Sequence, residues 1–270
     1  MKLQIIGGGK MGEALLAGLI NQGWATGDQL AVVEKDPGRA DALRAAFADV
    51  TVADAPAAAE GHVVAVKPGD VPAACRALAA TGPGSGTGAG PAPVLSIAAG
   101  VTLATLEAEL APGTPVVRAM PNTPALVGAG AAAIAGGTAA GDEHLAWAES
   151  ILGAVGTVAR VAEPLLDAVT GLSGSGPAYV FLVLEALIDG GVLAGLPRPV
   201  AAELATQTLV GAAKLVAETG ESPADLRAAV TSPAGTTAAG LRELERAGVR
   251  AALLDAVAAA TERSRELGRG

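Results

Sequence analysis

The first 160 residues alternate short apolar runs with segments of helical character. Apolar runs of four or five residues, bounded by glycine, proline or charged residues, predict β-strands. The predicted strands are Leu3–Ile6, Leu30–Glu34, Val50–Ala53, Val63–Val66, Val94–Ile97 and Val116–Met120. Helical segments separate them, among them Met11–Asn21 and Pro37–Phe47. Strands that alternate with helices predict an α/β fold with a doubly wound parallel sheet.

After about Arg160 the strand pattern stops and a helical period takes over. Proline stands at or near the start of several predicted helices, where its missing N–H costs nothing. These helices are Pro164–Thr170, Pro177–Ala194, Pro199–Thr219, Pro223–Val230, Thr237–Ala247 and Val249–Leu267. We therefore expect two domains, residues 1–162 with the sheet and residues 163–270 all helical.

The predicted helix Pro177–Ala194 is apolar around most of its circumference. A small helical domain has too little chain to bury such a helix by itself, so the pattern predicts a homodimer that interlocks through this domain. Glu185, Asp189 and the pair Gly190-Gly191 interrupt the apolar run and argue against a membrane span.

Composition excludes several classes of protein. A net charge of −9 argues against a nucleic-acid binder, which needs a basic face. Cys75 is the only cysteine, so no intrachain disulfide and no cysteine-rich metal site can form, and we expect no metal. Met1-Lys2 leads directly into the first strand without a signal peptide, which favours a cytoplasmic location. Residues 81–93 are rich in small and turn-forming residues and predict a surface loop, an insertion rather than a lid.

A glycine motif follows the first strand and opens the first helix, in the order Gly7-x-Gly9-x-x-Gly12. In that context the spacing predicts a Rossmann-like dinucleotide-binding loop, with the pyrophosphate at the helix N-terminus. The candidate cofactor-binding residues of the loop are Gly7, Gly8, Gly9, Lys10, Met11 and Gly12.

The end of the second strand gives conflicting signals about the cofactor. Glu34 stands where an acid accepts hydrogen bonds from the adenosine ribose, which favours NADH. Lys35 and Arg39 are close enough in sequence to meet a 2′-phosphate, which favours NADPH. Both Glu34 and Lys35 are cofactor-binding candidates, and the cofactor is expected to be NADPH or NADH.

Three later strand ends should lie at the same ligand-binding edge of the sheet. The fourth strand ends in Ala65-Val66-Lys67-Pro68, and the fifth is followed by the small residues Ala98 and Gly100, which leave room for a nicotinamide ring. Asn122 follows the sixth strand, where its amide can hold the nicotinamide carboxamide or stabilise the turn.

The segment Thr231–Thr237 is a turn rich in hydroxyl groups that opens a helix. Amides at a helix start can bind a carboxylate without any arginine. The candidate substrate-binding residues here are Ser232, Gly235, Thr236 and Thr237.

From Ile5 to about Leu254 the chain resembles the pyrroline-5-carboxylate reductase family. The segments that carry the resemblance are Ala65–Pro68, Arg118–Pro124, Leu172–Tyr179 and Thr231–Thr237. The resemblance implies reduction of the cyclic imine pyrroline-5-carboxylate to proline, with NADPH commonly preferred and NADH tolerated. It also implies a homodimer and allows further assembly into a decamer of dimers.

The resemblance also implies roles for individual residues. Thr237 would meet the ring nitrogen, Glu163 would lie near the substrate and hold a water, and Ser173 would line the substrate site. This chain departs from the family at Ala234, where glycine is usual, and alanine is strained there if the position requires a positive φ. A contact that the family makes through asparagine falls on Ala229 and is not carried over.

Two alternatives stay open on the residues alone. A hydroxy-acid dehydrogenase of similar build wants a lysine or histidine as proton donor. The chain has no lysine between Lys67 and Lys214, and its histidines are only His62 and His144. A nucleotide-sensing module would bind the cofactor without turnover.

Overall fold

A computed structural model describes residues 1–82 and 90–269 of the chain. The chain forms two compact units. The first comprises Met1–Ser175 together with Ala259–Gly270, and the second comprises Gly176–Ala258. The predicted loop at residues 81–93 joins a helix to a strand of the first unit, and its central residues 83–89 lie outside the described part.

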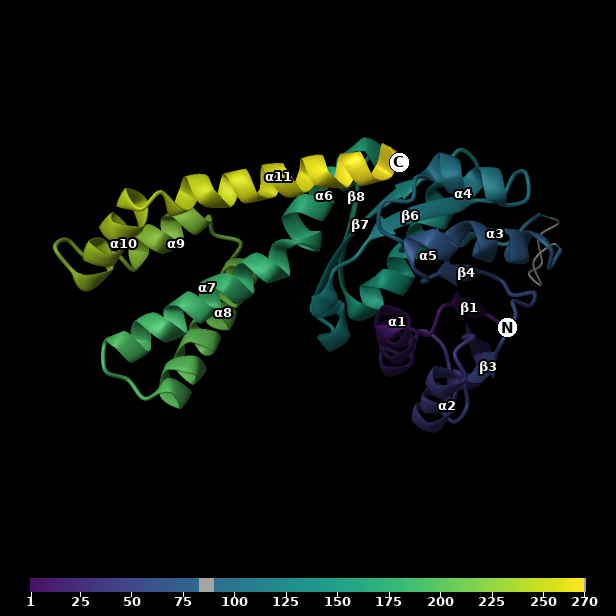
Figure 1. Ribbon diagram of the computed structural model, residues 1–270, viewed down its shortest axis with the longest axis horizontal. Coiled ribbons are helices and arrows are strands. Elements are labelled where there is room, and N and C mark those ends of the chain that lie inside the picture. Colours follow the sequence, from purple (N-terminus) through teal and green to yellow (C-terminus); the bar gives the residue numbers. More distant parts are fainter. Residues whose placement is uncertain (83–89, 270) are drawn as a thin grey trace. The chain divides into compact units, whose positions relative to one another are not determined.

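The first unit is built on one eight-stranded sheet with the order β3-β2-β1-β4-β5-β6-β7-β8 (Figure 1). Its strands are β1 (Leu3–Ile6), β2 (Leu30–Val33), β3 (Thr51–Ala53), β4 (His62–Val64), β5 (Val94–Ser96), β6 (Val116–Met120), β7 (Gly130–Gly136) and β8 (Gly156–Arg160). All six predicted strands are present. The parallel pairing from β3 to β6 confirms the doubly wound sheet, with the order reversing at β1 and β4.

The last two strands, β7 and β8, were not expected from the sequence. β7 pairs antiparallel with β6, with Arg118 opposite Ala135, and β8 then pairs parallel with β7. β7 reads Gly-Ala-Ala-Ala-Ile-Ala-Gly, and alanine and glycine have low strand propensity. The strand forms because β6 offers a free edge of hydrogen-bonding groups beside it. The sheet is therefore mostly parallel, with one antiparallel pair.

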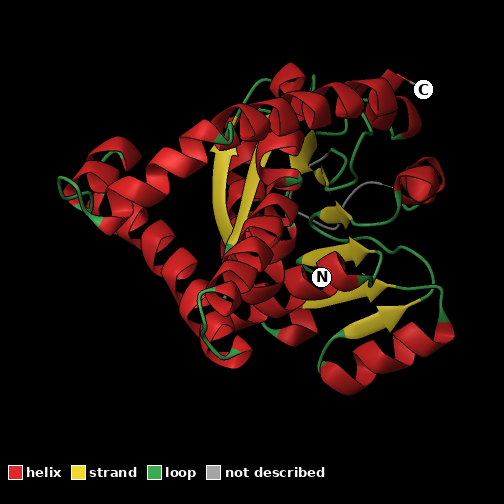
Figure 2. Ribbon diagram, turned by 60° about the vertical axis from the view of Figure 1, so that its left-hand side comes forward, coloured by secondary structure: helices red, strands yellow, loops and turns green. Residues whose placement is uncertain are grey.

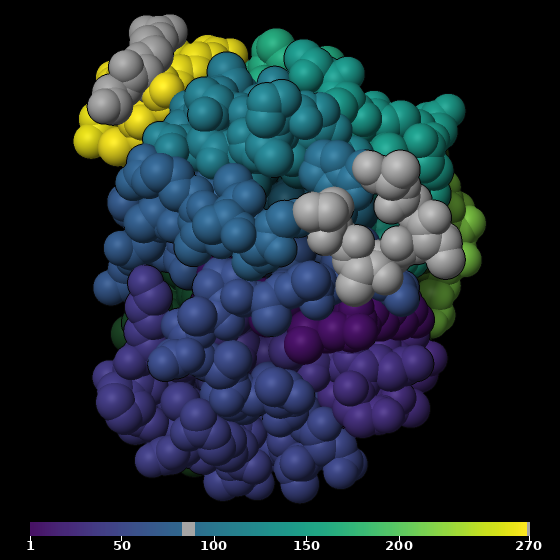
Figure 3. Space-filling model, turned by 90° about the vertical axis from the view of Figure 1, so that its right-hand side faces the viewer, coloured from purple at the N-terminus to yellow at the C-terminus, as the bar shows by residue number. Residues whose placement is uncertain are grey.

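Helices cover both faces of this sheet (Figure 2). Leucines of α1 (Lys10–Asn21) and α2 (Pro37–Ala46) and residues of α5 (Asp142–Leu152) form one core with Leu3 and Ile5 of β1. On the opposite face, α3 (Val71–Ala79), α4 (Leu103–Glu109) and α6 (Leu166–Val169) pack against Ile6, Val33 and Val64. Residues of the first βα units (purple) and residues after β5 (teal) occupy opposite ends of the face in Figure 3, as the strand order requires.

The second unit is all helical, as predicted. It contains α7 (Gly176–Leu193), α8 (Arg198–Thr219), α9 (Pro223–Ala229), α10 (Thr236–Arg246) and the first part of α11 (Val249–Arg269). α7 and α8 lie side by side (Figure 1), and Ala201 of α8 approaches Gly191 of α7 closely. A π-helical turn, Thr170–Gly174, precedes α7 within the first unit.

Large apolar side chains of α7 and α8 are exposed in the single chain. Leu182 is 67% exposed and Phe181 is 59% exposed, and α7 has no buried residue. By length and composition alone, the runs Glu163–Leu193 and Arg198–Thr219 would be long and apolar enough to cross a membrane. An exposed apolar surface of this extent needs another surface to cover it.

Candidate functional site

The glycine loop after β1 has the geometry of an anion cradle. Gly7 has φ +109°, and a Cβ at Gly12 would lie 2.1 Å from the Gly7 carbonyl oxygen, so both positions require glycine. Gly9 has open space where its Cβ would be. The first intrahelical bond of α1 runs from the Glu13 N–H to the Gly9 carbonyl, which leaves earlier amides unpaired within the helix. The loop therefore fits a dinucleotide pyrophosphate.

A cavity of about 530 Å³ lies beside this loop. It is lined by seven residues that the sequence predicted, namely Gly7, Gly9, Glu34, Lys35, Ala65, Val66 and Lys67. The structure adds two acids that sequence reasoning missed, Asp54 after β3 and Asp70 before α3. The position of Asp54 directly after a predicted strand was the signal that could have found it.

The phosphate loop and the fourth strand end are in close contact. A Cβ at Gly7 would lie 2.7 Å from the Ala65 carbonyl oxygen. Lys67 is exposed at the cavity, and Pro68 begins a short 3-10 helix that ends at Asp70. Ala98 is buried and Gly100 has φ +76°; neither lines this cavity.

Two side chains hold the backbone of Gly8 from both sides. The Gly8 N–H donates to Oε2 of Glu34 at 3.1 Å, and the Gly8 carbonyl accepts from Nε of Arg39 at 2.6 Å. Arg39 also pairs with Glu13 of α1 at 2.5 Å, and the second Glu34 oxygen accepts from the Asp36 N–H at 2.9 Å. These contacts hold the phosphate loop against α1 and against the start of α2.

Asn122 uses both ends of its side-chain amide within the chain. Its Nδ2 donates to the Ser173 carbonyl oxygen at 3.0 Å, and its Oδ1 accepts from the Ala131 N–H at 2.8 Å. The Ser173 hydroxyl donates to the carbonyl oxygen of Val169. Of the two roles predicted for Asn122, these contacts match the stabilisation of the turn, here between β6, β7 and the π-helical turn.

Glu163 lies at the end of the sheet domain and pairs with a residue that sequence reasoning missed. Its Oε1 accepts from Arg118 at 2.8 Å and from the Leu103 N–H at 2.7 Å. Asp167, one turn further on, accepts from the Ser264 hydroxyl of α11 at 2.6 Å. Both acids thus have partners within the first unit.

The turn Thr231–Thr237 belongs to the second unit and opens α10. Gly235 is the N-cap, without a side-chain cap, and the first intrahelical bond runs from Ala239 N–H to Gly235 O. The amides of Thr236, Thr237 and Ala238 are therefore unpaired within the helix. The Gly235 N–H itself donates to the Ser232 carbonyl at 3.0 Å, so Gly235 contributes space rather than a free donor.

The same turn contains the strain that the sequence suggested. Ala234 has φ +58° and is the one non-glycine residue of the described chain with positive φ. A Cβ at Gly235 would lie 2.3 Å from the Ser232 hydroxyl oxygen, so a larger residue there would displace this hydroxyl. Thr236 and Thr237 are exposed.

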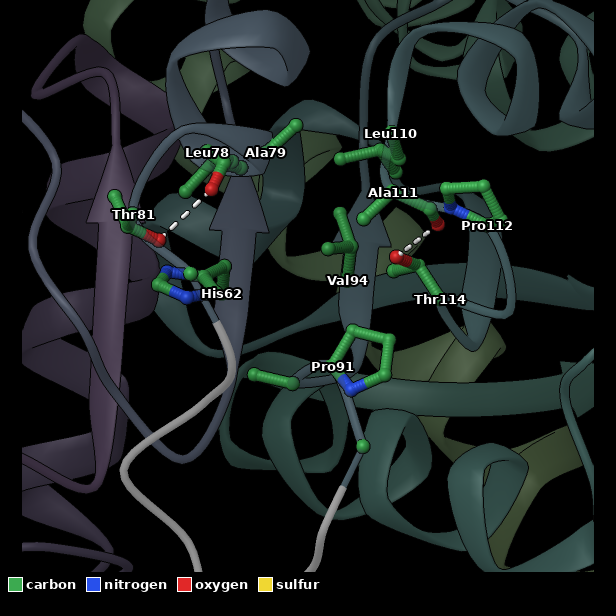
Figure 4. Close-up of a pocket in the computed structure, with 13 residues that line it drawn as sticks. His62, Leu78, Ala79, Thr81, Pro91, Val94, Leu110, Ala111, Pro112 and Thr114 are labelled. Atoms are coloured by element: carbon green, nitrogen blue, oxygen red, sulfur yellow. Dashed lines mark hydrogen bonds between the residues drawn. The ribbon is translucent and has the colours of Figure 1, made fainter.

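A second cavity, of about 260 Å³, lies at the amino end of β4 and β5 (Figure 4). His62, Leu78, Val94 and Leu110 contribute to its lining. Burial lowers the pKa of His62 to about 4, so the ring is neutral at pH 7. This cavity lies at the opposite strand ends from the phosphate loop and contains none of the predicted site residues.

Family models match both parts of the chain. Residues 163–267 match the model for pyrroline-5-carboxylate reductase dimerisation, and residues 2–85 match that for NADP oxidoreductase, coenzyme F420-dependent. The chain is 47% identical to the pyrroline-5-carboxylate reductase of Synechocystis, over 100% of this chain and 99% of that protein. It is 45% identical to that of Mycobacterium tuberculosis, over 98% and 96% respectively.

Solved structures agree with the sequence relatives. A pyrroline-5-carboxylate reductase from Coxiella burnetii is 34% identical, with a TM-score of 0.91 over 98% of both chains. A pyrroline carboxylate reductase from Plasmodium falciparum, solved with NADP bound, is 27% identical, with a TM-score of 0.80 over 99% of this chain and 98% of that one. The similarity to these reductases extends over the full length of the chain, and the dinucleotide loop and the uncapped, hydroxyl-rich start of α10 are consistent with it. The chain therefore belongs to the pyrroline-5-carboxylate reductase family.

Proposed function

We propose that this protein reduces pyrroline-5-carboxylate to proline with NADPH or NADH, the last step of proline biosynthesis. The observation that carries the proposal is the helix start at Thr236, which offers unpaired amides and hydroxyl groups without a side-chain cap. Such a site suits a small carboxylate. Family membership over the whole chain supports the same substrate.

The first unit supplies the cofactor site. Gly7, Gly9 and Gly12 shape the loop, and the amides of Lys10 and Met11 face the pyrophosphate from the start of α1. The dinucleotide, when bound, supplies the hydride. Ala98 and Gly100 leave space after β5 for its nicotinamide end.

The second unit supplies the substrate carboxylate site. The amides of Thr236, Thr237 and Ala238 bind the carboxylate, and the Thr237 hydroxyl orients the ring nitrogen. Ser232 and Gly235 shape the turn around it. Ser173 and Glu163, which belong to the first unit, are the other residues to which the resemblance gives a substrate role, and Arg118 positions Glu163.

The reaction places modest demands on proton transfer. An iminium accepts hydride more readily than a neutral imine, and the imine can arrive protonated near neutral pH. The protein's tasks are orientation, charge stabilisation and exclusion of water. These modest demands on proton transfer are consistent with the sequence, which has no lysine between Lys67 and Lys214 that could act as a proton donor.

We further propose that residues 163–270 act as the dimerisation domain of a cytoplasmic homodimer. The exposed apolar faces of α7 and α8 support this, because a second copy would cover them. Coverage by a second copy accounts for these helices without a membrane. A decamer of dimers is the larger state that the resemblance allows. Light scattering at micromolar concentration distinguishes a monomer, a dimer and this larger assembly.

The direct test is oxidation of NADPH or NADH with pyrroline-5-carboxylate, compared with a panel of 2-oxo acids. The expected result is turnover with the imine and none with the oxo acids. Turnover with an oxo acid alone would indicate a hydroxy-acid dehydrogenase. Cofactor binding without turnover of any substrate would indicate a nucleotide sensor.

A further inference from the structure

The adenosine end of the cofactor cavity has an acidic side. Three carboxylates line the cavity, from Glu34, Asp54 and Asp70, and two lysines, Lys35 and Lys67. Before any ligand binds, the lining therefore carries one more negative than positive side chain. A dinucleotide with a 2′-phosphate would bring about two further negative charges to this lining.

The Glu34 carboxylate is held in one orientation. Oε2 accepts from the Gly8 N–H and Oε1 from the Asp36 N–H, so the group cannot turn away without losing both hydrogen bonds. A carboxylate has about four acceptor sites, so two remain for the ribose hydroxyls of NADH. The same fixed oxygens would repel a 2′-phosphate.

Arg39 is the residue that would have to neutralise a 2′-phosphate, and the structure directs it elsewhere. Its Nε donates to the Gly8 carbonyl, and its terminal nitrogen pairs with Glu13. Arg39 does not line the cavity. Lys35 remains at the cavity, but as an exposed lysine on a flexible stem it orders a phosphate less well than a guanidinium fork.

We infer that this chain selects NADH over NADPH, with Glu34 as the specificity-determining residue and Arg39 as a positioning residue of the phosphate loop. The inference rests on the proposed reductase function and settles which of the two cofactors the site takes. Arg39 and Glu34 hold the same residue through its two adjacent peptide groups: Arg39 donates to the Gly8 carbonyl, and Glu34 accepts from the Gly8 N–H. A Cβ at Gly8 would lie 2.4 Å from Cδ1 of Leu43, so α2 packs closely against this residue.

The test is the affinity of the full-length protein for NADH and for NADPH, measured by fluorescence titration without any imine present. The wild-type chain should bind NADH more tightly than NADPH, by roughly tenfold or more. Glu34→Gln removes the charge and keeps the shape, and should shift the ratio toward NADPH by roughly tenfold. Asp41→Asn is the matched control, because it removes an exposed acid of α2 outside the cavity and should leave the ratio unchanged.

Arg39→Gln separates the two roles open to this residue. A positioning role predicts weaker binding of both dinucleotides with an unchanged ratio, whereas a 2′-phosphate receptor would lose NADPH affinity alone. Tighter binding of NADPH by the wild-type chain, an unmoved ratio in Glu34→Gln, or a loss confined to NADPH in Arg39→Gln would overturn the inference. Because binding is measured without substrate, failure of the inference is distinct from failure to reduce pyrroline-5-carboxylate.

Discussion

The carboxylate of Glu163 lies 2.8 Å from the guanidinium of Arg118 and joins the end of the sheet domain to β6. Arg118 is 9% exposed, so the Glu163 carboxylate replaces most of the water that would otherwise solvate its charge. Glu163 therefore stabilises the fold, in addition to its proposed place near the substrate.

Glu163→Gln should lower the free energy of unfolding by about 1–3 kcal/mol, because the buried arginine loses a charged acceptor. Urea unfolding measures this loss. Glu262→Gln, which breaks the more exposed pair with Arg265, is the control and should cost about 0–1 kcal/mol. Equal stability losses in both variants would show that the Arg118 pair contributes no more than a surface pair.

Gly9→Val should abolish cofactor binding while the fold survives. The φ of Gly9 is −63°, which any residue adopts, and nothing lies within 4 Å of its Cβ position. The branched side chain would instead fill the space that the pyrophosphate needs. Titration with the dinucleotide and thermal unfolding measure the two effects, and Gly9→Ala should give a smaller loss of affinity. Normal affinity in Gly9→Val would remove the loop from its assigned role.

Thr237→Ala should lower kcat/KM roughly ten- to hundredfold, because a hydrogen bond to a charged group contributes about 1.5–3 kcal/mol. The backbone amide at this position remains, so the carboxylate contact is kept. Cofactor affinity should stay near that of the wild type, and Thr237→Ser should recover most of the activity. If Thr237→Ala turned over normally, the nitrogen contact would have to be sought elsewhere, beginning with Ser173.

Ala234→Gly should maintain or raise stability, which is the opposite of the usual effect of this substitution. Alanine with φ +58° stores about 1–2 kcal/mol of backbone strain, and glycine costs about 0.5–1 kcal/mol in unfolded-state entropy. The net gain in the free energy of unfolding should lie between about 0 and about 1.5 kcal/mol by urea unfolding. Ala252→Gly, within α11, is the control and should lose about 1 kcal/mol. The same loss in both variants would mean that the turn stores no strain.

Stability should fall as the pH falls from about 6.5 to about 4, in part because of His62. Its folded-state pKa is lowered to about 4 by burial, so the unfolded chain takes up a proton first as the pH drops. The effect should reach about 3 kcal/mol by pH 4. His62→Gln should flatten this part of the pH profile relative to wild type. A profile that does not differ between wild type and His62→Gln would show that His62 is solvated in the fold.

The sequence by itself determined three features: the N-terminal part in which strands alternate with helices, the all-helical C-terminal part, and the phosphate loop. Six strands and the main helices follow from the periodicity of apolar residues. This periodicity is a local property of the chain and can be recognised without knowing which segments pack against each other. The glycine spacing sufficed for the loop because the positive φ of Gly7 and the close approach of Gly12 to the Gly7 carbonyl are local requirements of the backbone. The doubt about Ala234 was also local, and its positive φ confirmed it.

Only the tertiary structure decided the contacts between residues far apart in the chain. β7 depends on the edge of β6, since its alanines carry little strand propensity. The sequence did not determine which groups the Arg39 side chain contacts, and it left Arg39 beside Lys35 as a candidate to bind a 2′-phosphate. Its pairing with Gly8 and Glu13 requires α1 and α2 to lie side by side on one face of the sheet. Arg118 finds Glu163 for the same reason: 45 residues separate them, and only the packed sheet brings them to 2.8 Å.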